Sequence, residues 1–150
     1  MDNLQIASPE IFLLTATCVV LVVGLFLKPE QRQLNYLMAQ VSLVITLIMA
    51  SSQIGDAAQI GFSGAYGIDT MSASLKCWIL AIVFGGFLYS RDYLSERQIA
   101  RGEYYSLGLF GTAGMMIMVS ATNMLTIYLG LELLAPVSYT HLTLPTICSV

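Results

Sequence analysis

Long apolar stretches separated by short polar segments run along the first 135 residues of the chain. Each of the first four approaches the ~20 apolar residues that a helix needs to cross the ~30 Å hydrocarbon core of a bilayer. We expect helices at about 11–27, 36–54, 71–89, 104–120 and 123–136. The pattern therefore predicts an all-α integral membrane protein with four transmembrane helices and the first half of a fifth.

The composition agrees with a membrane location. Of the 150 residues, 57% are hydrophobic and 10% are charged, whereas soluble domains usually carry about 25% charged residues. The sequence pI of about 4.8 leaves no basic patch for a phosphate backbone, so we expect no nucleic-acid partner. The three cysteines form no CxxC pair, and neither a metal site nor a disulfide framework is expected.

The polar connections alternate in charge. Lysine and arginine follow the first and third expected spans, at Lys28, Arg32, Arg91, Arg97 and Arg101. The N-terminal segment and the glycine-rich connection at about 55–69 carry acids but neither lysine nor arginine. Because short cytoplasmic loops are enriched in lysine and arginine, we expect the N-terminus outside. The glycines and aromatics at 55–69 allow a short hairpin on that outer surface.

Two ionisable side chains fall inside the expected spans. Lys76 is about five residues into the third span. Its amine is therefore close enough to the outer surface to snorkel to water, and a buried role is the alternative. Glu132 follows Asn123 by nine residues, which at ~1.5 Å per residue places it near the middle of the bilayer.

An ionised acid at the centre of a membrane helix costs at least ~2.5–3.5 kcal/mol. Glu132 must therefore be protonated, paired or hydrated, and we predict a proton or ion site there. The alternative is an acid that only hydrogen-bonds across a helix interface, for example with Tyr128. No soluble catalytic motif is present, and the glycines of IVFGGF and GLFGTAG are expected to permit close helix packing.

The stretch GEYYSLGLFGTAGMMIMVSATNMLTIYLGLELLA, Gly102 to Ala135, resembles subunit N of the bacterial proton-pumping NADH:quinone oxidoreductase (complex I). It begins with an acid and two tyrosines and continues into a helix rich in glycine and methionine. A polar turn follows, and then a helix with a G-x-E-L core that contains Glu132. The earlier IDTMSASLK, in which an aspartate precedes the helix carrying Lys76, is also similar to this family.

The resemblance implies the N-terminal part of an antiporter-like subunit of fourteen helices in a bacterial inner membrane, with the N-terminus in the periplasm. In such subunits a fifth-helix glutamate, matched here by Glu132, pairs with a lysine on the seventh helix. That pair takes part in proton translocation coupled to quinone reduction, and Lys76 is a second candidate. The implied partners are other membrane subunits of the complex. The parent complex, not this chain, would hold NAD, FMN, iron–sulfur clusters and quinone, so no redox chemistry is expected here.

The last residues resemble translated sequencing-adapter DNA. VSYTHLTLPT, Val137 to Thr146, matches the translation of a common transposase-type library adapter at every position, and the index and constant sequence that follow account for the rest. We therefore expect 137–150 to be a non-native tail and His141 to have no role. A fragment that ends within the fifth helix is expected to be inactive.

Two alternative functions stay open. One is a homologous antiporter-like protein that shares the fifth-helix glutamate, either the L or M subunit of complex I or its homologue in the multisubunit sodium/proton antiporters, known there by the letter D. The other is a membrane scaffold that transports nothing. Lysines in apolar helices and proline-interrupted spans downstream would favour transport, whereas a natural stop soon after Glu132 would favour the scaffold.

Overall fold

The computed structural model describes residues 3–26, 32–55, 57–97 and 101–135. The expected tail at 137–150 lies outside them. The helices are α1 (Asn3–Ile6), α2 (Ser8–Phe26), α3 (Arg32–Ser52), α4 (Thr70–Arg97) and α5 (Arg101–Val119), followed by a helix at Met124–Ala135. Between α3 and α4 lie strand β1 (Gln59–Gly61), the short 3-10 helix η2 (Phe62–Gly64) and strand β2 (Tyr66–Ile68).

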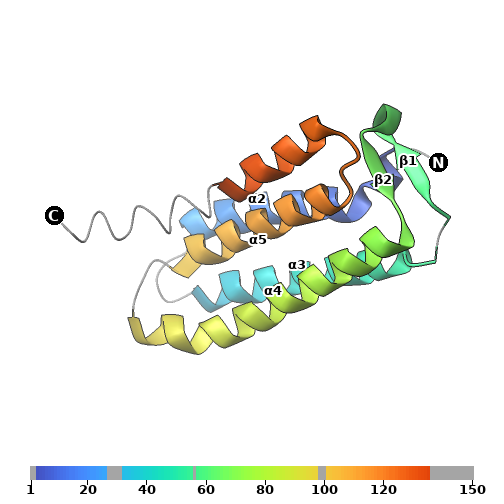
Figure 1. The fold of residues 1–150 in the computed structure, drawn as a ribbon. Coiled ribbons are helices and arrows are strands. Elements are labelled where there is room, and N and C mark those ends of the chain that lie inside the picture. Colours follow the sequence, from blue (N-terminus) through green and yellow to red (C-terminus); the bar gives the residue numbers. More distant parts are fainter. Residues whose placement is uncertain (1–2, 27–31, 56, 98–100, 136–150) are drawn as a thin grey trace.

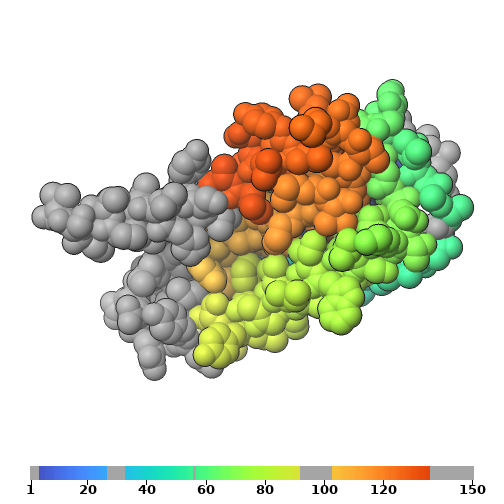
Figure 2. Space-filling view, in the orientation of Figure 1, coloured from blue at the N-terminus to red at the C-terminus, as the bar shows by residue number. Residues whose placement is uncertain are grey.

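The four long helices lie side by side, and successive helices run in opposite directions (Figure 1). α2 packs against α3 and α5, and α4 packs against the same two helices. α2 and α4 therefore occupy opposite corners of the bundle. The helix Met124–Ala135 lies on the outside, where its side chains form part of the molecular surface (Figure 2).

Three of the helices in the described residues are long and apolar enough to cross a membrane: Ser8–Phe26, Gln33–Ser52 and Thr70–Arg91. The fourth expected span corresponds to α5. α5 begins at Arg101 with Glu103 in its first turn, so the apolar part of this helix is shorter than the whole helix. The predicted all-α membrane fold is confirmed, with helices close to the expected positions.

Two helix boundaries differ from the prediction in a way that affects function. α4 continues to Arg97 rather than ending at about 89, because SRDYLSER is polar but contains neither proline nor glycine to stop a helix. Its 28 residues span ~42 Å. α2 begins at Ser8 rather than at about 11, with Glu10 in its first turn, whereas Glu10 was expected to lie outside the span.

The bundle core contains large apolar side chains from each long helix: Leu13, Leu43, Leu80, Leu109 and Met116. The packing expectation for GLFGTAG is confirmed at Gly108 and Gly114, where an added Cβ would lie under 3.0 Å from neighbouring atoms. The same expectation for IVFGGF is not met within the described residues. At Gly85 and Gly86 an added Cβ would meet no other described atom within 4 Å.

Candidate functional site

A β-hairpin covers one end of the bundle, at the same end as the start of α2 (Figure 1). β1 and β2 are antiparallel, with Gln59 opposite Ile68 and Gly61 opposite Tyr66. The turn between them is left-handed at Phe62 (φ +53°), Ser63 (φ +56°) and Gly64 (φ +91°), and only the glycine adopts this backbone without a steric cost. The hairpin expected from the glycine-rich connection is therefore present.

Hydrogen bonds hold this hairpin against the turn that follows α5. The Gly67 amide donates to the Ser120 carbonyl at 2.9 Å, and the Thr126 hydroxyl donates to the Ala65 carbonyl at 3.0 Å. Tyr66 pairs with Ala121 in an isolated antiparallel bridge. These contacts join segments that are far apart in the sequence, and they fix the position of the Tyr66 side chain.

Asp69 directly precedes α4 and caps its first turn, which fixes the position of Lys76 along the helix. The Asp69 carboxylate accepts a hydrogen bond from the Thr70 amide at 2.8 Å, and its carbonyl accepts the amide of Ala73 at 2.9 Å, which is typical of a helix N-cap. Lys76 follows in the second turn, on the side of α4 that faces the bundle. Its side chain is completely buried.

Lys76 forms an ion pair with Glu10 of α2. The Lys76 Nζ lies 2.6 Å from the Glu10 Oε1, and the exposed fractions of the two side chains are 0% and 3%. By strict geometry neither carboxylate oxygen of Glu10 has an aligned hydrogen-bond donor among the described residues, although the Tyr66 hydroxyl is close enough to interact with this carboxylate. The pair therefore joins α2 to α4, the two helices at opposite corners of the bundle.

Tyr66 completes this cluster from the hairpin. Lys76 Nζ donates to the Tyr66 hydroxyl oxygen at 3.0 Å and lies 5.2 Å from the centre of the ring. Burial raises the pKa of the Tyr66 hydroxyl well above its usual range, the Glu10 carboxylate raises it further, and the Ser120 hydroxyl acts in the opposite direction. The tyrosine therefore stays protonated at physiological pH.

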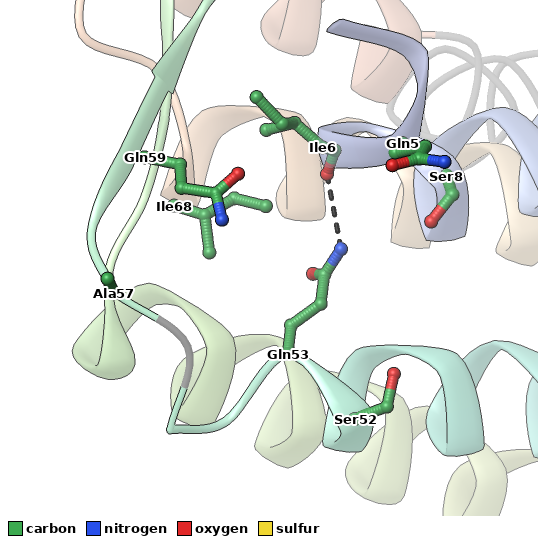
Figure 3. A pocket seen from close by; sticks show the side chains of 8 residues that line it. All are labelled: Gln5, Ile6, Ser8, Ser52, Gln53, Ala57, Gln59 and Ile68. Carbon is green, nitrogen blue, oxygen red and sulfur yellow. Dashed lines mark hydrogen bonds between the residues drawn. The ribbon is translucent and has the colours of Figure 1, made fainter. Parts of the chain in front are cut away.

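A polar pocket of about 180 Å³ lies beside this cluster, between the N-terminal segment, the end of α3 and the hairpin (Figure 3). Its lining is Gln5, Ile6, Ser8, Ser52, Gln53, Ala57, Gln59 and Ile68. The Gln53 side-chain amide donates to the Ile6 carbonyl at 3.2 Å across it. Gln5 and Ala57 are exposed, so the pocket lies at the molecular surface, and its volume is enough for several water molecules.

The structure places the two predicted site residues apart. Lys76 is buried and does not snorkel, which decides between the two alternatives considered for its side chain. Glu132 is exposed on the helix Met124–Ala135, and Lys76 is paired with Glu10 instead.

Sequence reasoning missed Glu10 and Tyr66. A signal for Glu10 was present: proline is favoured at the first position of a helix, so Pro9 placed the start of the span before Glu10. Glu10 also shares a buried stripe of α2 with Leu13, Thr17 and Val20, at the spacing of one helix face. No comparable local signal pointed to Tyr66.

The part of the chain that the structure describes contains no cluster of three or more His, Cys, Asp or Glu side chains that could hold a metal ion. The ionisable groups that it does bring together, Glu10, Lys76 and Tyr66, can hold, share and pass protons. Proton transfer needs only an acid and a base within hydrogen-bond distance of each other.

Comparison with known proteins shows which proteins this chain is related to. No family model matches it. It is 43% identical over 139 residues to NADH-quinone oxidoreductase subunit N of Alkalilimnicola ehrlichii, covering 93% of this chain and 28% of that protein. This chain is a homologue of NADH-quinone oxidoreductase subunit N. Similar matches to subunit N are found in Ruthia magnifica, with 42% identity over 89% of this chain and 28% of the relative, and in Nitrosomonas europaea, with 40% identity over 86% and 27%.

The chain thus spans a little over a quarter of the length of the subunit N proteins that it matches. These relatives are named as parts of an oxidoreductase. Together with the long apolar helices, they indicate a multi-pass membrane protein.

Proposed function

We propose that this chain is part of a complex I membrane subunit that contributes to proton translocation coupled to quinone reduction. The observation that carries the proposal is the similarity to subunit N over 93% of the chain. The Glu10–Lys76 ion pair, buried among membrane-length helices, supports it, because ionisable groups inside membranes usually mark ion or proton pathways. In that complex the subunit acts as part of a translocase, and we expect the redox cofactors NAD, FMN, iron–sulfur clusters and quinone in other parts.

Glu132 is the carboxylate that we assign to proton transfer. It lies on an apolar helix whose other exposed side chains include Leu129 and Leu131, and an uncovered carboxylate there would face lipid at high cost. We therefore propose that a cationic side chain from a segment outside the described residues covers and pairs with Glu132 in the assembled subunit.

The subunit is proposed to lie in a bacterial inner membrane beside other membrane subunits of the complex. The hairpin and the start of α2 share one end of the bundle, whereas α4 ends and α5 begins with arginine at the other end (Figure 1). Because arginine-rich connections stay in the cytoplasm, we place the hairpin on the periplasmic side.

Cysteine labelling tests this orientation. In spheroplasts, with the other cysteines replaced by alanine, we expect Ile60→Cys in the hairpin to react with a membrane-impermeant maleimide, since Ile60 is 74% exposed. Arg91→Cys, at the opposite end, should react only after the membrane is permeabilised. Reaction at Arg91→Cys alone in unpermeabilised spheroplasts would show the inverted orientation.

Sequencing the gene beyond the codon of Ala135 tests transport against the scaffold alternative. We expect the native frame to continue the helix with apolar residues in place of 137–150 and to encode further apolar spans that carry lysine. A stop codon directly after this helix would contradict the proposal, and native codons for VSYTHLTLPT would contradict the adapter interpretation.

A further inference from the structure

We propose that Glu10 and Lys76 form a second proton-exchange site, at the hairpin end of the bundle, that takes up and releases protons on the hairpin side of the membrane. This inference deepens the proposed function and rests on it. It assigns a role to Glu10, to the Tyr66 hydroxyl and to the pocket of Figure 3.

The position of the ion pair favours a functional role over a purely structural one. A buried ion pair contributes little net stability, because the desolvation of both charges offsets their attraction, and apolar side chains of similar size are often as stable. Glu10 and Lys76 join α2 to α4 near the hairpin end, and the core residues Leu13 and Leu80 follow them one turn later on the same helices, so apolar side chains at both positions would extend that core. The end of α3 and the end of α5 add no charged residue here, at 46–55 and 110–120.

The hydrogen bonding around the ion pair allows Glu10 to accept a proton. The Lys76 Nζ lies 2.6 Å from the Glu10 Oε1 and the Tyr66 hydroxyl also interacts with this carboxylate, but the two oxygens have about four acceptor positions between them, so Glu10 can still accept a proton. Transfer breaks an N–H bond of the Lys76 ammonium and forms an O–H bond on Glu10, which converts the ion pair into a neutral acid and amine. The Tyr66 hydroxyl, which accepts from Lys76 at 3.0 Å, positions the nitrogen for this transfer. The amine is then reprotonated by a proton that pocket water carries in, and Glu10 releases its own proton to the same water, which restores the ion pair with one proton exchanged.

The pocket supplies the water for that exchange. Ile6 and Ile68 both line the pocket. Ile6 also packs in one cluster with Tyr66 and Ile68, and both isoleucines border the pocket in Figure 3. The two isoleucines therefore separate the polar pocket from Tyr66 and its partner Lys76, and small movements of Ile6 and Ile68 would let water reach the ion pair.

The experiment uses the complete complex with its full-length subunit, reconstituted into proteoliposomes, and measures NADH-driven proton pumping together with NADH oxidation. In the double variant Glu10→Gln/Lys76→Met we expect pumping to fall about tenfold while assembly and NADH oxidation are retained. The matched control is Arg91→Met/Glu103→Gln, which removes one exposed cation and one exposed acid at the opposite end and should pump normally.

Pumping at the wild-type rate in the Glu10→Gln/Lys76→Met complex would overturn the inference, because a structural ion pair can be replaced by a neutral one but a proton site cannot. If this complex fails to assemble, Tyr66→Phe decides instead. It keeps the ion pair and the ring and removes only the hydroxyl, so we expect normal assembly, slower pumping and an altered pH profile of pumping. Wild-type pumping across the pH range in Tyr66→Phe would also overturn the inference.

The same experiment distinguishes a failure of the proposed function from a failure of the site at Glu10. If the unmodified complex pumps no protons, the proposed function is wrong. If it pumps and Glu132→Gln abolishes pumping while Glu10→Gln/Lys76→Met does not, only the site at Glu10 is wrong.

Discussion

Lys76→Met alone is expected to destabilise the folded chain by about 3–5 kcal/mol. The substitution leaves the Glu10 carboxylate, which is 3% exposed, without the cation 2.6 Å away. The Tyr66 hydroxyl cannot replace the lost charge. The free energy of unfolding of the purified chain in bicelles, measured by denaturant titration, gives the effect.

The double variant Glu10→Gln/Lys76→Met is the control for that measurement. Because both charges are removed, we expect its free energy of unfolding to lie within about 1 kcal/mol of the wild type or above it. Equal losses in the single and double variants would show that the side-chain packing of Lys76, not its charge, holds α2 and α4 together.

Gly114→Leu is expected to displace the helix Met124–Ala135 from α5. A Cβ at Gly114 would lie 2.7 Å from the Gly130 carbonyl oxygen and 3.2 Å from the Leu133 Cβ. Backbone cannot move aside as a flexible side chain can, so the helix must shift, at a cost of typically 1–3 kcal/mol or more. The distance between spin labels at the exposed Leu129 and Tyr89, measured by pulsed EPR, should increase and broaden.

Gly85→Ala provides the contrast, because an added Cβ there meets no described atom within 4 Å. Alanine is favoured over glycine in a helix by about 1 kcal/mol, so we expect unchanged label distances and an equal or higher stability. If Gly114→Leu behaves like Gly85→Ala, the close approach of α5 and the last helix is not present in solution.

The sequence predicted most of the fold because membrane helices follow directly from the length of apolar stretches. Helix ends were less predictable. The third span was expected to end at about 89 because a polar stretch was taken to end the helix. The arginine, glutamate and leucine of SRDYLSER are good helix formers, however, and α4 continues to Arg97. At α2 the opposite error excluded Glu10, although Pro9 marked the true start.

The candidate site was only half visible in the sequence for a related reason. Lys76 and Glu132 stood out because each interrupts an apolar stretch. The partner of Lys76 depends on contacts between segments distant in sequence: Glu10 is 66 positions earlier, and Tyr66 reaches Lys76 only because the hairpin is bonded to Ser120 and Thr126. Such pairings follow from tertiary packing, which no local pattern encodes.

The most direct test of whether this chain is part of a proton-translocating subunit is to measure proton pumping by the complex with Glu132→Gln in its full-length subunit. Glutamine keeps the size of the side chain and removes its ability to carry a proton. With assembly and NADH oxidation retained, we expect pumping in proteoliposomes to fall at least about tenfold. Pumping at the wild-type rate in a fully assembled Glu132→Gln complex would contradict the assignment.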